Sequence, residues 1–243
     1  MRIGLFDSGI GGLNVLKEFI KKYPNNEYIY YGDTKNVPYG DKDKDELLKL
    51  STNIIRFFER KHVSLIIIAC GTVSSNCYLE LQKLTKIKII DIITPTINYL
   101  KKSNFNKVLL LGTKRTVESH IFKNNINNIV EVKTPEFVLM IENNSIDSKV
   151  IENYLVNYRD YDAIVLGCTH YPLLTSEIKK YVSSNTLLID MGYVLVNNLD
   201  ITNNSNYKLE LYFSKLNDEI ENNIKKIIKS DYVIYNVNDL WYN

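Results

Sequence analysis

The chain has 243 residues, of which 45% are hydrophobic and 24% are charged, and its net charge is only +2. This composition is typical of a soluble globular protein that buries a sizeable core. So small a charge gives no electrostatic reason to expect nucleic acid or a membrane as a partner. After Met1 and Arg2 the chain enters a short strand-like run without a long apolar segment, so we expect no signal peptide and a cytoplasmic location.

Short apolar runs alternate along the chain with longer segments of helical period, which predicts an α/β fold with mainly parallel sheets. The predicted strands cover residues 3–6, 28–31, 65–69, 87–91, 108–111, 163–166 and 187–189. Amphipathic helices are predicted over residues 47–58 and 216–228, and we expect their apolar faces to be buried in the core.

The order of these elements suggests a double structure. A strand that ends in Gly112-Thr113 starts a second series that is similar to the first, and each series reaches a strand followed by a cysteine. We therefore expect two pseudo-symmetric α/β domains, residues 1–94 plus about 205–243 and residues 95–204. Ligands of open α/β sheets bind at the carboxyl ends of the strands, so the site is expected in the crevice between the domains.

A glycine-rich segment, residues 7–12, connects the first predicted strand to a helix. Backbone N–H groups at such a turn suit a carboxylate or a phosphate. The dinucleotide fingerprint fails because Asn14 stands where its third glycine is needed, and no phosphate-binding G-x-x-x-x-G-K-[ST] occurs. The alternative is a tight turn that needs positive φ angles. Residues 37–40 are of types that are common in turns. Because this segment is expected at the same edge of the sheet as Asp7, it is also a candidate part of the site.

The three cysteines are an odd number, and none forms a C-x-x-C pair. Neither a disulfide framework nor a common zinc site is indicated, so we predict reduced thiols and no metal. Cys77 follows Cys70 by two helical turns and is expected to pack in the core. Cys70 and Cys168, in contrast, each stand directly after an apolar run, and Cys168 is followed by Thr169 and His170.

A buried cysteine is most often a small hydrophobe, but two cysteines at matching strand ends favour a chemical role. A helix N-terminus or His170 would tune the pKa of such a thiol. One possible reaction uses a nucleophilic cysteine with His170 as its base. The other is proton abstraction beside a carboxylate, with one thiolate removing the proton and the second thiol returning one on the opposite face. The paired placement favours the second reaction.

Five segments together, residues 6–12, 31–34, 37–40, 69–72 and 167–173, make the chain resemble the glutamate racemases of the aspartate/glutamate racemase superfamily. The resemblance implies interconversion of L- and D-glutamate without a cofactor, supply of D-glutamate for peptidoglycan, and a homodimer. By motif match Cys70 and Cys168 are the acid/base thiols, with Asp7 and His170 as their polar partners. The implied substrate-binding residues are Ser8, Pro38, Tyr39, Gly40, Gly71, Thr72, Thr116, Glu142 and Thr169.

The chain departs from the family pattern at several positions. Gly71 stands where the family has asparagine, which removes an amide that would contact substrate. Leu139 replaces an expected proline, and Thr134 stands where the family often has cysteine. These departures leave two alternatives open: a racemase of another amino acid, aspartate being the nearest, or a weakly active relative that acts as a binding protein.

Overall fold

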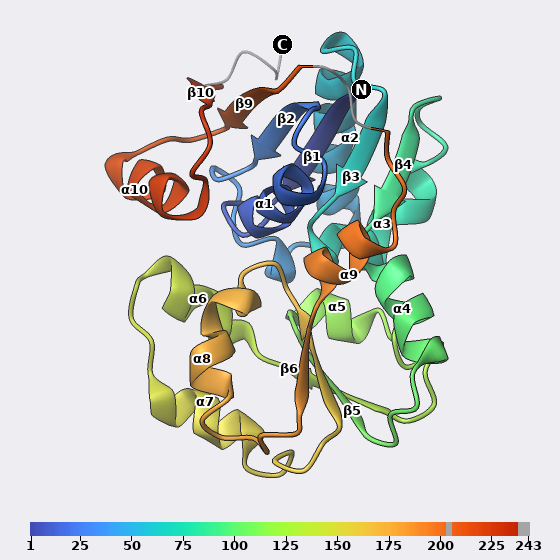
Figure 1. Ribbon diagram of the computed structural model, residues 1–243, viewed down its shortest axis with the longest axis vertical. Helices are drawn as coiled ribbons and strands as arrows, with labels where there is room; N and C mark the ends of the chain where they lie inside the picture. Colours follow the sequence, from blue (N-terminus) through green and yellow to red (C-terminus); the bar gives the residue numbers. More distant parts are fainter. Residues whose placement is uncertain (203–205, 238–243) are drawn as a thin grey trace.

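Two parallel β-sheets lie end to end along the long axis of the molecule in the computed structural model, which describes residues 1–202 and 206–237 (Figure 1). The predicted α/β fold is therefore confirmed. The first sheet has the strand order β10-β9-β2-β1-β3-β4, and the second has the order β6-β5-β7-β8. We call each sheet with the helices packed on it the first and the second half.

The bounds of the strands follow the apolar runs closely. The strands of the first sheet are β1 (Arg2–Asp7), β2 (Glu27–Gly32), β3 (Leu65–Ile68), β4 (Lys88–Asp91), β9 (Lys208–Phe213) and β10 (Val233–Asn236). Those of the second sheet are β5 (Val108–Gly112), β6 (Ile129–Lys133), β7 (Ala163–Gly167) and β8 (Leu187–Asp190). Central strands such as β3 and β7 are buried at every position, because helices cover both faces of a parallel sheet.

Helices alternate with these strands. The α-helices are α1 (Leu13–Lys22), α2 (Lys44–Arg60), α3 (Gly71–Leu81), α4 (Ile93–Lys102), α5 (Lys114–Glu118), α6 (Pro135–Glu142), α7 (Ser148–Leu155), α8 (Thr175–Ile178), α9 (Met191–Asn197) and α10 (Asp218–Ile227). Two 3-10 helices, η1 (Tyr39–Asp41) and η2 (Tyr171–Leu174), lie in the connections. None of the helices in the described ranges is long and apolar enough to cross a membrane.

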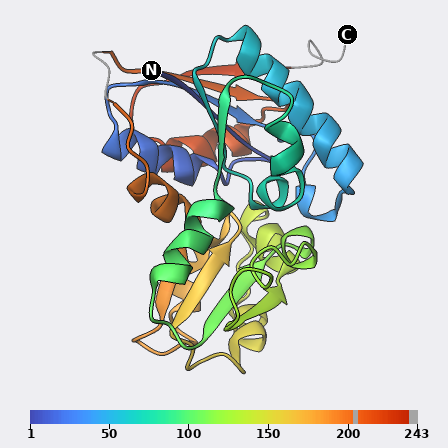
Figure 2. The same ribbon diagram turned by 90° about the vertical axis from the view of Figure 1, so that its right-hand side faces the viewer.

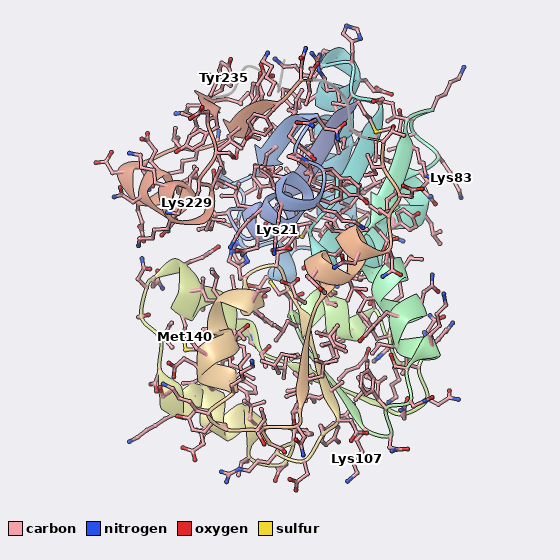
Figure 3. The ribbon with its side chains drawn as sticks, in the orientation of Figure 1. Lys21, Lys83, Lys107, Met140, Lys229 and Tyr235 are labelled. Atoms are coloured by element: carbon pink, nitrogen blue, oxygen red, sulfur yellow. The ribbon has the colours of Figure 1, made fainter. Side chains whose placement is uncertain are left out.

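The prediction located all seven apolar strands and both amphipathic helices, but it missed β6, β9 and β10. β9 pairs with β2, so the chain returns to the first sheet after completing the second. The predicted domain limits stay a prediction, and their residues 203–205 and 238–243 lie outside the described ranges. Figure 3 shows Lys83 and Lys107 projecting from the outer edges of the first and second half respectively.

The two halves meet through helices as well as through the chain connections. α4 leads from the first sheet into the second, and α9, which follows β8, packs against both α1 and α4 (Figures 1 and 2). Tyr23 on the first half donates its hydroxyl hydrogen to the carbonyl of Leu199, and Lys22 donates to the carbonyl of Val196. These contacts join the end of α1 to the segment at the end of α9.

Candidate active site

A cavity lies between the halves, where the carboxyl ends of strands from both sheets come together. Segments that follow β1, β2 and β3 form one wall, and segments that follow β5, β6 and β7 form the other. The lining residues are Ser8, Val37, Pro38, Tyr39, Gly40, Asp41, Cys70, Gly71, Thr72, Thr113, Lys114, Pro135, Val138, Leu139, Glu142, Cys168, Thr169 and His170.

All the predicted site residues line this cavity except Asp7 and Thr116, which lie directly behind its wall. Sequence reasoning missed several lining residues. Thr113 carried a signal, since it follows a strand end as the cysteines do. Lys114 and Val138 carried none, because α5 and α6 turn them toward the cavity only through tertiary packing.

Cys70 is the N-cap residue of α3 and is only 4% exposed. Burial raises the pKa of its thiol well above the ordinary value, and the negative charge of Asp7 adds to the rise. Hydrogen bonds from the Val73 N–H, in the first turn of α3, and from Ser8 act in the opposite direction and favour the thiolate. Cys168, from the other half, also raises the pKa of Cys70 electrostatically, so the two thiols face the same space.

Cys168 follows β7 directly and is 8% exposed. Its Sγ lies 3.6 Å from Nδ1 of His170, and Nε2 of that ring lies 3.5 Å from Oε1 of Glu142. Nε2 has no hydrogen-bond partner within the described part of the chain, so the Glu142 contact is electrostatic. Burial alone would lower the pKa of His170, but Cys168, Glu142 and Asp7 together raise it well above its ordinary value.

Asp7 ends β1 and is fully buried. Its Oδ2 accepts hydrogen bonds from the backbone N–H groups of Gly9 at 3.3 Å and Gly12 at 2.9 Å. Its Oδ1 accepts one from Oγ1 of Thr169 at 3.2 Å, which crosses from the other half. Asp7 therefore links the glycine-rich turn to the segment that carries Cys168.

The glycine-rich turn does not need positive φ angles, so that alternative is wrong. None of the ten glycines, all of which lie in the described ranges, has a positive φ. The turn needs glycine because other groups approach too closely. A Cβ on Gly11 would lie 2.6 Å from both Nδ1 of His170 and Oγ1 of Thr169. On Gly12 it would lie 2.5 Å from Cβ of Asp7.

A chain of hydroxyl groups crosses the cavity wall. Oγ1 of Thr72, in the first turn of α3, lies 3.0 Å from Oγ1 of Thr113. Thr113 caps α5, and its Oγ1 in turn lies 3.0 Å from Oγ1 of Thr116. Thr116 is thus placed to orient Thr113, while Thr72 and Thr113 face the cavity.

A buried carboxylate holds the loop at residues 37–40. Oδ2 of Asp33 accepts a hydrogen bond from the hydroxyl of Tyr39 at 2.6 Å, and Oδ1 accepts one from Oγ of Ser214 at 2.6 Å. Nδ2 of Asn36 donates to both oxygens at 2.9 and 3.0 Å. Asp33 therefore fixes the Tyr39–Gly40 part of the wall to the end of β9.

Replacing Asp33 with alanine is expected to lower the free energy of unfolding by about 3 kcal/mol, because three buried or half-buried donors lose a charged acceptor. Urea unfolding followed by circular dichroism would measure the change. Asp160→Ala, on an exposed loop, is the matched control and should have little effect. An unchanged unfolding free energy for Asp33→Ala would show that this network does not hold the loop.

The fold and the cavity define the class of the protein: an α/β protein with its site between the carboxyl ends of two parallel sheets. Two thiols, one from each half, face this site, and each lies near a second ionisable group, Asp7 or His170. Among the described residues no cluster of three or more histidine, cysteine or acidic side chains is arranged to hold a metal ion.

Comparison with known proteins agrees with this description. The family model for Asp/Glu/Hydantoin racemase matches residues 21–199. Glutamate racemase from Aquifex pyrophilus is 34% identical over 96% of this chain and 96% of its own length. That from Fusobacterium nucleatum is 41% identical over 74% of each chain. The structure of glutamate racemase from Francisella tularensis in complex with D-glutamate has a TM-score of 0.85, with 28% identity over 97% of both chains.

The chain belongs to the Asp/Glu racemase family, as the resemblance of its motifs led us to expect. It is an enzyme of the isomerase class, a racemase.

Proposed function

We propose that this racemase interconverts L- and D-glutamate without a cofactor, by transfer of the Cα proton between Cys70 and Cys168. The observation that carries the proposal is the presence of two buried thiols from opposite halves in the wall of one cavity. A base on one face of a carbon and an acid on the other face is the arrangement that inversion requires. The relatives named glutamate racemase support glutamate as the substrate.

The cavity offers donors for both carboxylates of such a substrate. The hydroxyl groups of Thr72 and Thr113 line the wall, and the N-terminus of α3 presents backbone N–H groups there. Removal of the Cα proton develops negative charge on the adjacent carboxylate. Each fixed donor aimed at that oxygen would contribute about 3 kcal/mol, by analogy with an oxyanion-hole donor.

The two thiols need different help to act as bases. Cys168, Glu142 and Asp7 raise the pKa of His170, and Nδ1 of its ring lies 3.6 Å from Sγ of Cys168, where it can exchange a proton with that thiol. Cys70 has Asp7 nearby, whose charge favours the thiol. A substrate ammonium beside Cys70 would lower the pKa of this thiol, because an opposite charge favours the ionised form. Proton transfer to Cys70 is thereby coupled to substrate binding.

We further propose that the enzyme acts as a cytoplasmic homodimer and supplies D-glutamate for peptidoglycan. Aspartate is the alternative substrate, because Gly71 leaves the wall without the amide that the family pattern places there. The weakly active binding protein is the less favoured alternative, since both thiols, Asp7 and His170 are present together.

Exchange of the Cα hydrogen in D₂O tests the proposal directly. Proton NMR should show loss of the Cα signal of L-glutamate and of D-glutamate, accompanied by inversion that circular dichroism detects. L- and D-aspartate, tested under the same conditions, decide the substrate. Faster exchange of aspartate would select the alternative, and no exchange of any acidic amino acid would refute the proposed function.

A further inference from the structure

The N-terminus of α3 touches the carboxyl end of β7 at a single glycine. A Cβ on Gly71 would lie 2.8 Å from the carbonyl oxygen of Gly167 and 3.4 Å from Cε of Met191. The first distance is well inside van der Waals contact. Gly71 directly follows Cys70, and Gly167 directly precedes Cys168. The contact therefore joins the two segments that carry the thiols.

The carbonyl of Gly167 has little freedom to retreat. Gly167 is the last residue of β7, an inner strand of the second sheet; it pairs with Gly112 of β5, and a Cβ on Gly167 would itself lie 2.5 Å from the carbonyl oxygen of Leu111. A side chain at position 71 would thus displace α3 rather than β7. The hydrogen bond between Thr72 and Thr113, which starts one residue further along α3, would be stretched by the same movement.

We propose that Gly71 is a positioning residue for racemisation: its missing side chain lets α3 rest on β7, and this contact sets the separation of Cys70 and Cys168. The inference rests on the proposed function, because it concerns the distance across which a proton is transferred. It also gives the departure from asparagine a consequence other than a lost polar contact. The crevice of this chain is closed by backbone contact at the place where an asparagine side chain would need room.

Gly71→Ala tests the inference with a single methyl group. We expect kcat to fall by about tenfold or more, because a displacement of about 1 Å between reacting groups is costly, while KM changes much less. Proton transfer should become more rate-limiting, so the isotope effect with Cα-deuterated substrate should rise. Alanine forms helix better than glycine, so a loss of α3 would not explain such a result.

Gly71→Asn gives the sharper contrast. If the missing amide were the only consequence of Gly71, asparagine would raise the activity. We expect it to lower kcat at least as much as alanine does, because its Cβ meets the same carbonyl. Activity equal to or above that of the unmodified enzyme would overturn the inference. So would recovery of activity in Gly71→Ala/Met191→Ala, which would identify Met191 rather than β7 as the obstacle.

Alkylation of the thiols gives a readout that does not depend on turnover. In Gly71→Ala, iodoacetamide should modify Cys70 and Cys168 several-fold faster, with Cys77, buried on the face of α3 that packs against α2, as the internal reference. Gly192→Ala is the matched control, since its Cβ would meet Cγ2 of the buried Val15 at 2.9 Å and so crowds α9 against α1 rather than the segments that carry the thiols. Unchanged alkylation rates in Gly71→Ala would show that the contact does not set the separation of the thiols, even if the enzyme proved to act on another substrate.

Discussion

Cys70→Ser and Cys168→Ser are each expected to reduce racemisation by about 10³-fold, which is within the range for loss of a general acid or base. A serine hydroxyl does not ionise near neutral pH and cannot replace a thiolate as base. The remaining thiol can still remove the Cα proton of one of the two enantiomers. Each variant should therefore exchange the Cα hydrogen of one enantiomer with D₂O without inverting it, and the two variants should select opposite enantiomers.

Proton NMR of the Cα signal, combined with polarimetry, separates exchange from inversion in these variants. Cys77→Ala is the control, because burial raises the pKa of the Cys77 thiol to about 11 and its Sγ contacts only the carbonyl of Lys44 among the described polar groups. It should retain racemisation. If both serine variants exchanged the same enantiomer, the assignment of one thiol to each face would be wrong.

The strands that sequence reasoning recovered are those that read as short apolar runs, and these include the partly exposed strands β4 and β8. β3 and β7 are buried at every position and read as continuous apolar runs. β6, at the edge of the second sheet, exposes Val130 and Lys133, and β9 carries Lys208 and Glu210 between apolar residues. Their partly polar faces dilute the apolar signal that identifies a buried strand.

The site could be predicted largely because parallel strands end at the same edge of a sheet. Cys70 and Cys168 directly follow such strands, and the other residues that line the cavity also lie in segments that follow strands. Contacts between residues far apart in the chain could not be predicted. The hydrogen bond of Asp33 with Ser214 and the approach of Gly71 to Gly167 depend on how the elements pack, which no local pattern records.

Asp7→Asn separates two roles that Asp7 combines. Its hydrogen bonds should survive, because an amide oxygen can accept from the N–H groups of Gly9 and Gly12. The hydroxyl of Thr169 can then accept from the amide nitrogen. What the substitution removes is the negative charge. That charge raises the pKa of Cys70, so its removal must lower the pKa, although burial will still hold it above the ordinary value.

The pH dependence of Cys70 alkylation should therefore shift to lower pH in Asp7→Asn, while the free energy of unfolding changes little. If Asp7 only opposed formation of the thiolate, racemisation would become faster. We expect it to become about 100-fold slower instead, because we propose that this carboxylate assists proton transfer on the Cys70 side. Faster racemisation together with the lower alkylation midpoint would show that Asp7 acts on Cys70 only through its charge. An unchanged pH dependence of alkylation would show that the charge of Asp7 does not affect the pKa of the Cys70 thiol.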